Sequence, residues 1–210
     1  MQTLLRIDSS ARLDASHSRA LGDHFVARAR EQFPNVAVRL RDLQTRPIEP
    51  ITQDTIAGFY QTPEMMTDAD KAATALSDTL IDELQAADTL LITAPMYNFS
   101  VPANLKAWID QIVRIGKTFS YENGAFGGLV KTRTAYVCCA YGAAGYSEGG
   151  TFRAANFLEP YLDFLLKFLG VETVHFISAE MLTADAATVA REIAAARSQI
   201  DAHLTALAAE

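Results

Sequence analysis

The chain has 210 residues, of which 50% are hydrophobic and 20% are charged, and its formal net charge is −7. This composition can bury the core of a single α/β domain over residues 1–210, and the absence of any basic run argues against nucleic-acid binding. The apolar runs are too interrupted to cross a bilayer, and the N-terminus MQTLLRIDSS lacks a charged start and a long apolar core. We therefore expect no membrane contact and no signal peptide.

Predicted strands and helices alternate along the whole chain. Continuous apolar runs predict strands, and apolar residues at helical spacing predict helices. In chain order, the sequence predicts strand 3–8, helix 19–33, strand 36–40, helix 68–86, strand 89–94, helix 102–115, strand 132–140, helix 157–169, strand 172–180 and helix 185–208. Five strands separated by helices predict a doubly wound parallel sheet with helices on both faces.

Local signals set several of these boundaries. Residues 43–67 contain three prolines and a glycine, so we expect an irregular segment with at most one short helix. Asp68 is a candidate N-cap for the helix that follows it, and Pro102 suits the first turn of the next helix. Strand 89–94 is apolar on both faces, as a central parallel strand is.

The two cysteines, Cys138 and Cys139, are adjacent in a predicted strand. Successive strand side chains point to opposite faces, so we expect no disulfide between them. Free buried thiols are typical of a reducing compartment, and we expect a cytoplasmic protein.

The loop after the first strand is rich in hydroxyl groups. It has neither the glycine pattern of a dinucleotide site nor that of a P-loop. Serine hydroxyls and free amides at a helix N-terminus favour an anion, and without a lysine they suit a phosphate monoester that is held rather than cleaved. An ordinary serine N-cap on a polar turn is an equal alternative at this point. The serines are Ser9, Ser10, Ser16 and Ser18, with Arg12, His17 and Arg19 as sources of added charge.

The loop after the third strand reads PMYNFS, residues 95–100. A turn needs only small or polar residues, whereas Met96 and Phe99 offer surfaces that pack on a flat heteroaromatic ring. Amides near Tyr97 and Asn98, and the Asn98 side chain, suit the polar edge of such a ring. The alternative is an apolar plug that closes the end of the sheet.

The loop after the fourth strand reads AYGAAGYSEGG, residues 140–150. Its small residues allow the backbone to approach a ligand closely, although a flexible loop is the default interpretation of a glycine-rich segment. In a doubly wound sheet, ligands bind outside the carboxyl ends of the strands. All three unusual loops are predicted to meet at that edge.

No nucleophile or metal site stands out in the sequence. The spacings of a Cys-His pair, of a Ser-His-Asp triad and of a G-x-S-x-G elbow are absent. His24, His175 and His203 are dispersed over predicted helices and a strand, so we expect structural roles for them and no bound metal.

The segment APMYNFSVPANLKAWIDQIVRIGKTFSYENGAFGGLV resembles the corresponding part of the FMN-dependent NADH-azoreductases, a branch of the flavodoxin-like quinone reductases. The early serine loop is similar to the phosphate loop of that family, and the similarity covers the whole chain. The resemblance implies the strand order 2-1-3-4-5, non-covalently bound FMN, and a homodimer with active sites at the interface.

The resemblance also assigns residues to the cofactor. Ser10, Ser16, His17 and Ser18 would hold the phosphate, and Met96, Tyr97, Asn98 and Phe99 would line the isoalloxazine ring. Ala140, Tyr141, Gly142 and Ala143 stand where the family usually has Ser-Arg-Gly-Gly. With the serine hydroxyl and the arginine missing, backbone contacts to the pyrimidine edge are what we expect there, and the change bears on nicotinamide preference or rate.

The implied activity is a two-step hydride transfer. NADH or NADPH reduces the flavin and leaves, and a quinone or azo compound then takes its place and is reduced. No side chain need act as a strong acid or base; Tyr97, Phe99 and Tyr121 are candidates for the substrate side of the site. The main alternative is a flavodoxin-type electron carrier. A phospho-acceptor receiver domain is disfavoured because strand 89–94 does not end in aspartate, and a binding module without activity is a third alternative.

Two helices favour a dimer on pattern alone. Helix 157–169 is apolar almost all the way round, more than one sheet face requires, and helix 102–115 has a broad apolar arc made of Leu105, Trp108, Ile109, Ile112 and Val113. Residues 117–128 carry three aromatic residues around Asn123-Gly124, which predicts a projecting hairpin, and we expect it to cover the active site of the partner subunit. An ordinary buried helix and an ordinary surface hairpin are the alternatives.

Overall fold

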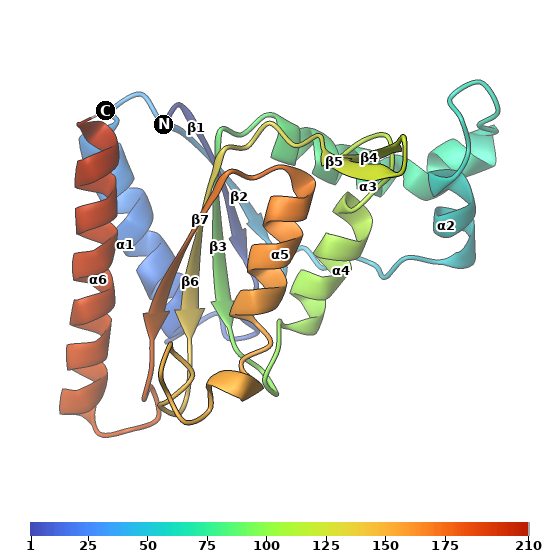
Figure 1. Ribbon diagram of the computed structural model, residues 1–210. Helices are drawn as coiled ribbons and strands as arrows, with labels where there is room; N and C mark the ends of the chain where they lie inside the picture. Colours follow the sequence, from blue (N-terminus) through green and yellow to red (C-terminus); the bar gives the residue numbers. More distant parts are fainter. Residues whose placement is uncertain (210) are drawn as a thin grey trace.

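Five parallel strands form the central sheet of the computed structural model, which describes residues 1–209 (Figure 1). Their order is β2-β1-β3-β6-β7, which is 2-1-3-4-5 when the strands of this sheet are numbered along the chain. The predicted flavodoxin-like fold class is therefore confirmed. The strands are β1 (Thr3–Asp8), β2 (Ala37–Asp42), β3 (Thr89–Pro95), β6 (Thr134–Ala140) and β7 (Thr173–Ala179).

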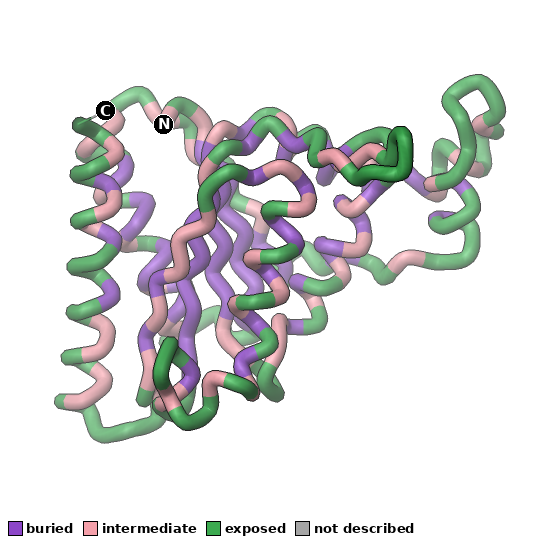
Figure 2. Tube along the Cα trace, in the orientation of Figure 1, coloured by how far each residue is buried: buried purple, intermediate pink, exposed green. Residues whose placement is uncertain are grey.

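Helices cover both faces of this sheet. On one face lie α1 (His17–Gln32) and α6 (Ala186–Ala208). On the other lie α3 (Asp68–Gln85), α4 (Ala103–Ile112) and α5 (Glu159–Leu169). The three central strands, β1, β3 and β6, are buried along most of their length (Figure 2), whereas most residues of the edge strands β2 and β7 are exposed or partly buried. Because side chains alternate along a strand, Cys138 packs toward α1 and α6 while Cys139 packs toward the other layer. Both thiols are free, as predicted.

Side-chain caps explain where the helices differ from the predicted ranges. Asp68 is not the cap of α3: Thr67 is, and Asp70 reaches back to the Thr67 amide in a capping box. Helix α4 ends at Ile112, three residues earlier than predicted. The Thr118 hydroxyl donates to the Ile112 carbonyl at 2.6 Å, which satisfies the last turn and directs the chain into the next element.

Two smaller elements project from one side of the sheet (Figure 1). The irregular segment contains one short helix, α2 (Gln53–Phe59), as predicted. The predicted hairpin is also confirmed, as β4 (Phe119–Glu122) and β5 (Ala125–Gly128), with positive φ angles of 52° and 80° at Asn123 and Gly124. These angles match the type I′ turn of a two-residue hairpin.

A single 3-10 turn, η1 (Arg153–Ala155), precedes α5. The described helices all fall short, in length or in apolar character, of what a membrane crossing requires.

Candidate active site

Three loops, joined by part of the loop after β7, line a cleft of about 220 Å³ at the carboxyl ends of β1, β3 and β6. The parallel strands bring these loops together although they are far apart in sequence. Most of the residues predicted to bind a cofactor line this cleft: Ser10, Ser16, His17, Ser18, Met96, Tyr97, Ala140, Tyr141 and Gly142. The remaining lining residues are Arg12, Pro95, Leu182 and Thr183.

The first wall of the cleft is the loop between β1 and α1. Ser16 is the N-cap of α1, and its hydroxyl lies 3.4 Å from that of Ser18. The N-terminus of α1 and these two hydroxyls lie on the same side of the cleft, and Arg12 and His17 line it beside them. Hydroxyl donors, a helix N-terminus and the Arg12 guanidinium together fit a phosphate monoester.

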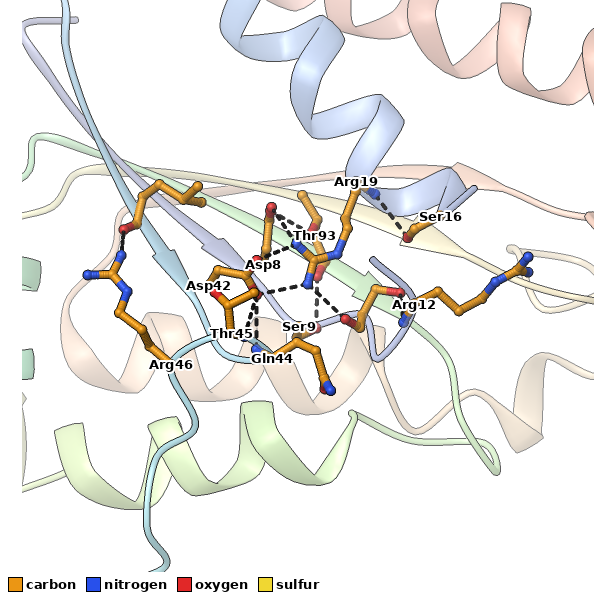
Figure 3. Close-up of polar contacts among 12 residues, drawn as sticks. Asp8, Ser9, Arg12, Ser16, Arg19, Asp42, Gln44, Thr45, Arg46 and Thr93 are labelled. Carbon is orange, nitrogen blue, oxygen red and sulfur yellow. Dashed lines mark hydrogen bonds and ion pairs between the residues drawn. The ribbon is translucent and has the colours of Figure 1, made fainter. Parts of the chain in front are cut away.

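Arg19 does not contribute to this wall, although the sequence offered it as a source of charge. Its guanidinium is buried and turned toward Asp8 and Asp42, whereas the Arg12 side chain points the other way (Figure 3). The hydrogen bond from Arg19 outweighs burial and lowers the pKa of Asp42 to about 2. This pair is therefore fully charged at neutral pH.

The second wall is built on a strained turn. Tyr97 and Ser100 exchange two backbone hydrogen bonds of 3.2 Å, and between them Asn98 and Phe99 have φ angles of 49° and 71°. A positive φ is costly for an aromatic residue, and such strain concentrates at functional sites. The Phe99 carbonyl accepts from the Phe157 amide at 3.0 Å, which anchors the turn.

This turn carries two predicted residues out of the cleft. Asn98 lies instead on a neighbouring hollow of about 590 Å³, together with Tyr97, Lys106 and Tyr161. The Phe99 side chain is exposed. Among the described residues, nothing accepts a hydrogen bond from the amides of Asn98 and Phe99, so these donors are free for a ligand at the rim.

Met96 and Tyr97 form the apolar part of the lining. The Met96 amide donates to the Ala140 carbonyl at 3.0 Å, which joins the second wall to the third. The Tyr97 hydroxyl accepts from the Ala11 amide at 3.3 Å, which joins it to the first. A thioether and an aromatic ring held in this way offer a surface on which a flat ring can pack.

The third wall presents backbone to the cleft. The Tyr141 side chain is fully buried, and its hydroxyl donates to Glu159 Oε1 at 2.5 Å and accepts from Asn156 at 3.2 Å. Burial, reinforced by the nearby Glu159 carboxylate, raises the pKa of Tyr141 well above its ordinary value. Ala143 lies outside the lining, and its carbonyl accepts from the Met181 amide at 3.3 Å.

Glu180 holds the rest of this loop. Its carboxylate accepts from the consecutive amides of Gly145, Tyr146 and Ser147 at 2.8, 2.9 and 2.7 Å. Burial would raise the pKa of Glu180, but these hydrogen bonds outweigh it and lower that pKa. This contact was not predictable from the sequence, because nothing in the pattern pairs a glutamate after β7 with a loop more than thirty residues earlier.

His24, His175 and His203 lie on two helices and a strand, as predicted, and two of them come together in the fold. The rings of His175 and His203 lie 4.4 Å apart beside Tyr136, on the α6 side of the sheet. His24 pairs with Asp201. Within residues 1–209 there is no group of three or more histidine, cysteine or carboxylate side chains that could hold a metal ion.

The chain as a whole matches a known family. The profile of the flavodoxin-like fold family matches residues 2–204. A protein of Xanthobacter autotrophicus named FMN-dependent NADH:quinone oxidoreductase is 52% identical over 174 residues, covering 83% of this chain and 84% of that protein. A Pseudomonas aeruginosa protein named FMN-dependent NAD(P)H:quinone oxidoreductase 1 is 39% identical over 185 residues, covering 86% and 87%. The chain belongs to the flavodoxin-like family, in the branch of the FMN-dependent NADH:quinone oxidoreductases.

Solved structures agree with this fold. An azoreductase from Bacillus anthracis superimposes with a TM-score of 0.86 at 22% identity, over 97% of this chain and 99% of that one. A second structure from Bacillus anthracis, an FMN-dependent NADH-azoreductase in complex with FMN, has the same TM-score at 21% identity, over 99% and 100% of the chains. At such identities the likeness establishes the architecture.

Proposed function

We propose that this chain is an FMN-dependent enzyme that uses NADH or NADPH to reduce quinones and azo compounds. The observation that carries the proposal is one cleft with three matched walls: a serine-rich helix N-terminus, a Met96–Tyr97 surface and a backbone edge at residues 140–142. These walls fit, in order, a phosphate, a flat ring and the polar rim of that ring. The names of the relatives support the same cofactor and reaction.

Each wall has a role in holding FMN, which when bound supplies the redox chemistry. The hydroxyls of Ser10, Ser16 and Ser18 and the His17 side chain receive the phosphate. Met96 and Tyr97 pack against the ring. The backbone at Ala140, Tyr141 and Gly142 faces its pyrimidine edge.

The chain's own groups orient the substrates and stabilise charge. The amides of Asn98 and Phe99 have no acceptor among the described residues and lie next to Tyr97 of the lining, so they are the donors that would stabilise negative charge on a bound ligand. The Tyr97 hydroxyl accepts from the Ala11 amide, so its own hydrogen is available to an oxygen or nitrogen of the substrate. Donor and acceptor substrates use the same face in turn, which makes the reaction a two-step (ping-pong) one.

The working unit is a homodimer in this proposal. Phe164 on α5 is 71% exposed, and Tyr121 and Phe126 on the hairpin are exposed beside a hollow of about 540 Å³. Tyr121 lies on this hollow and outside the lining of its own cleft, so it contributes to a substrate site only across a subunit interface. Exposed apolar faces of this kind are typical of interfaces. Sedimentation velocity tests this: a dimer is expected, and a monomer at micromolar concentration contradicts it.

Two further properties belong to the proposal. Residues 1–210 act as one domain, which is supported by a family match that spans nearly all of them. The enzyme works in the cytoplasm, where its two free cysteines, both buried, stay reduced.

Initial-rate kinetics test the reaction. NADH oxidation is followed at several fixed benzoquinone concentrations, with FMN-loaded protein. A two-step reaction through a shared site gives parallel lines in double-reciprocal plots, whereas a complex that holds both substrates at once gives intersecting lines. Flavin-loaded protein that does not turn over with either nicotinamide would instead be a carrier.

A further inference from the structure

Arg19 occupies an unfavourable place for a cation. It lies in the first turn of α1, where the helix dipole favours negative charge, and that turn contains no acidic residue. Arg19 is only 9% exposed, and its Nε atom is buried without a hydrogen-bond partner. A residue that breaks a local rule and is buried at a cost is often explained by function.

The guanidinium group joins the ends of β1 and β2 to the loop from Ser10 to Ser18, here called the phosphate loop (Figure 3). Nη1 and Nη2 form a two-pronged pair with Asp42, at the end of β2, with distances of 2.7 and 2.8 Å. Nη1 also donates to Asp8, at the end of β1, at 3.2 Å. Nη2 donates in addition to the Ser10 carbonyl at 2.8 Å. Only the planar fork of arginine suits all of these acceptors together.

Arg19 contacts both ends of the phosphate loop. Its side chain holds the Ser10 carbonyl at the start, and its backbone amide donates to the Ser16 hydroxyl, 3.5 Å away, at the end. The base of the loop is fixed to the third strand as well, because the amide and hydroxyl of Ser9 both donate to the Thr93 carbonyl. Arg19 therefore contacts the start of the loop through its side chain and the end through its backbone amide.

The buried groups of the cluster beneath the loop are balanced in charge. Arg6 forms a two-pronged pair with Asp8 at 2.8 and 2.9 Å, as Arg19 does with Asp42. The four buried groups, Arg6, Arg19, Asp8 and Asp42, balance in charge, and the exposed Asp23 also pairs with Arg6, at 2.7 Å. Both Nη atoms of Arg19 are engaged by Asp8, Asp42 and the Ser10 carbonyl, and the guanidinium lies outside the cleft lining, so Arg19 does not bind the phosphate directly.

We propose that Arg19 is a positioning residue that holds the loop from Ser10 to Ser18 in the shape that receives the FMN phosphate, with Asp42 as its anchor. The inference rests on the proposed FMN site. It predicts that loss of Arg19 weakens binding of the phosphate specifically, because the ring is held by the other two walls.

The test compares FMN with riboflavin, which lacks the phosphate. Apoprotein is titrated with each flavin by fluorescence quenching, and the ratio of the two dissociation constants is measured. In Arg19→Met the preference for FMN over riboflavin is expected to fall at least ~10-fold, the effect of losing about one charge-assisted hydrogen bond to the phosphate. Riboflavin affinity is expected to stay within about threefold. An unchanged preference would overturn the proposal.

Two further variants distinguish the loss of loop positioning from repulsion between the phosphate and an unpaired Asp42. Arg19→Met leaves Asp42 as an unpaired anion behind the phosphate, so the double variant R19M/D42N removes that charge as well. The preference is expected to stay low in the double variant, and its recovery would show that repulsion alone caused the loss. Asp42→Asn breaks the two-pronged pair while keeping its shape, and a lowered preference is expected there too. That variant decides the matter if R19M does not fold.

Arg41→Met is the matched control. Arg41 is a neighbouring arginine on β2 that pairs with Glu83, outside the cleft lining. Its loss removes a partly buried ion pair without contact to Ser10, so the flavin preference is expected to stay at the wild-type value. A fall equal to that of R19M would assign the effect to general destabilisation. Wild-type protein that binds both flavins equally would refute the FMN site itself, whereas a wild-type preference retained in R19M refutes only the role of Arg19.

Discussion

The first and third walls of the cleft are built on opposite principles. The loop after β1 directs hydroxyl side chains into the cleft and is held from below by charged side chains. The loop after β6 turns both of its tyrosines, Tyr141 and Tyr146, into the core and directs backbone to the cleft. The carboxylate of Glu180 then holds the remainder of that loop through its amides.

This difference indicates which of the two loops tolerates side-chain substitutions without loss of ligand binding. A wall that binds through backbone tolerates new side chains if they find a place in the core, as Tyr141 does against Glu159. A wall that binds through hydroxyls does not, because each lost hydroxyl is a lost hydrogen bond. The same difference explains why this chain can have Ala140 and Tyr141 where the azoreductases that it resembles usually have serine and arginine. The serine loop, which binds through side chains, is kept.

The largest expected effect comes from removing the hydroxyls of the first wall. Ser16→Ala combined with Ser18→Ala is expected to weaken FMN binding by ~100-fold or more, since each hydrogen bond to an anion contributes about 1.5–3 kcal/mol. Riboflavin affinity should change by less than about threefold. Titration of the apoprotein with both flavins checks this, and an equal loss for both would mean that these serines only cap α1.

A smaller effect is expected at the third wall. Tyr141→Phe removes the hydroxyl that bonds Glu159 and is expected to lower the free energy of unfolding by about 1–3 kcal/mol. FMN affinity should stay within about twofold, because the backbone keeps its place. Urea unfolding and flavin titration of the same sample give both numbers. A large loss of FMN affinity with unchanged stability would show that this wall binds through its side chain after all.

Lowering the pH is expected to have the smallest of these effects, on the hydrogen bonds of Glu180 and Asp42. The pKa of Glu180 is lowered on folding, so its hydrogen bonds contribute above the ordinary value of 4.5 and are lost as the pH falls through the lower folded value. The pKa of Asp42 is lowered to about 2, so the Arg19 pair persists until the pH falls to that value.

Amide exchange between about pH 6 and pH 2 tests this contrast. Residues 145–147 should lose protection in step with the titration of Glu180, while the Arg19–Asp42 contact persists to about pH 2. The variant Glu180→Gln should show no such acid step in residues 145–147. Loss of protection in this loop with the same pH dependence in both proteins would assign it to another group.

The sequence was sufficient for the fold and for the meeting of the loops. Apolar runs gave the five strands, and parallel pairing brings Ser10, Met96 and Ala140 to one edge whatever their side chains do. Local chemistry also predicted the Asn123-Gly124 turn.

Contacts between residues far apart in the chain could not be predicted from the sequence. Arg19 was offered as a source of charge for the phosphate, but its direction depends on Asp42, which comes close only after β2 pairs with β1. Phe99 was expected against the flavin, but the positive φ angles at Asn98 and Phe99 carry it out of the cleft. Leu182 and Thr183 line the cleft because β7 pairs with β6, which the sequence pattern does not specify.

The most direct test of the account is a pair of half-reactions followed on one sample by visible absorption without oxygen. For the proposed enzyme we expect the visible absorption of bound flavin to bleach fully on addition of NADH or NADPH and to return when benzoquinone is added. A flavin that neither nicotinamide bleaches, or a colourless protein that takes up no added FMN, would contradict it.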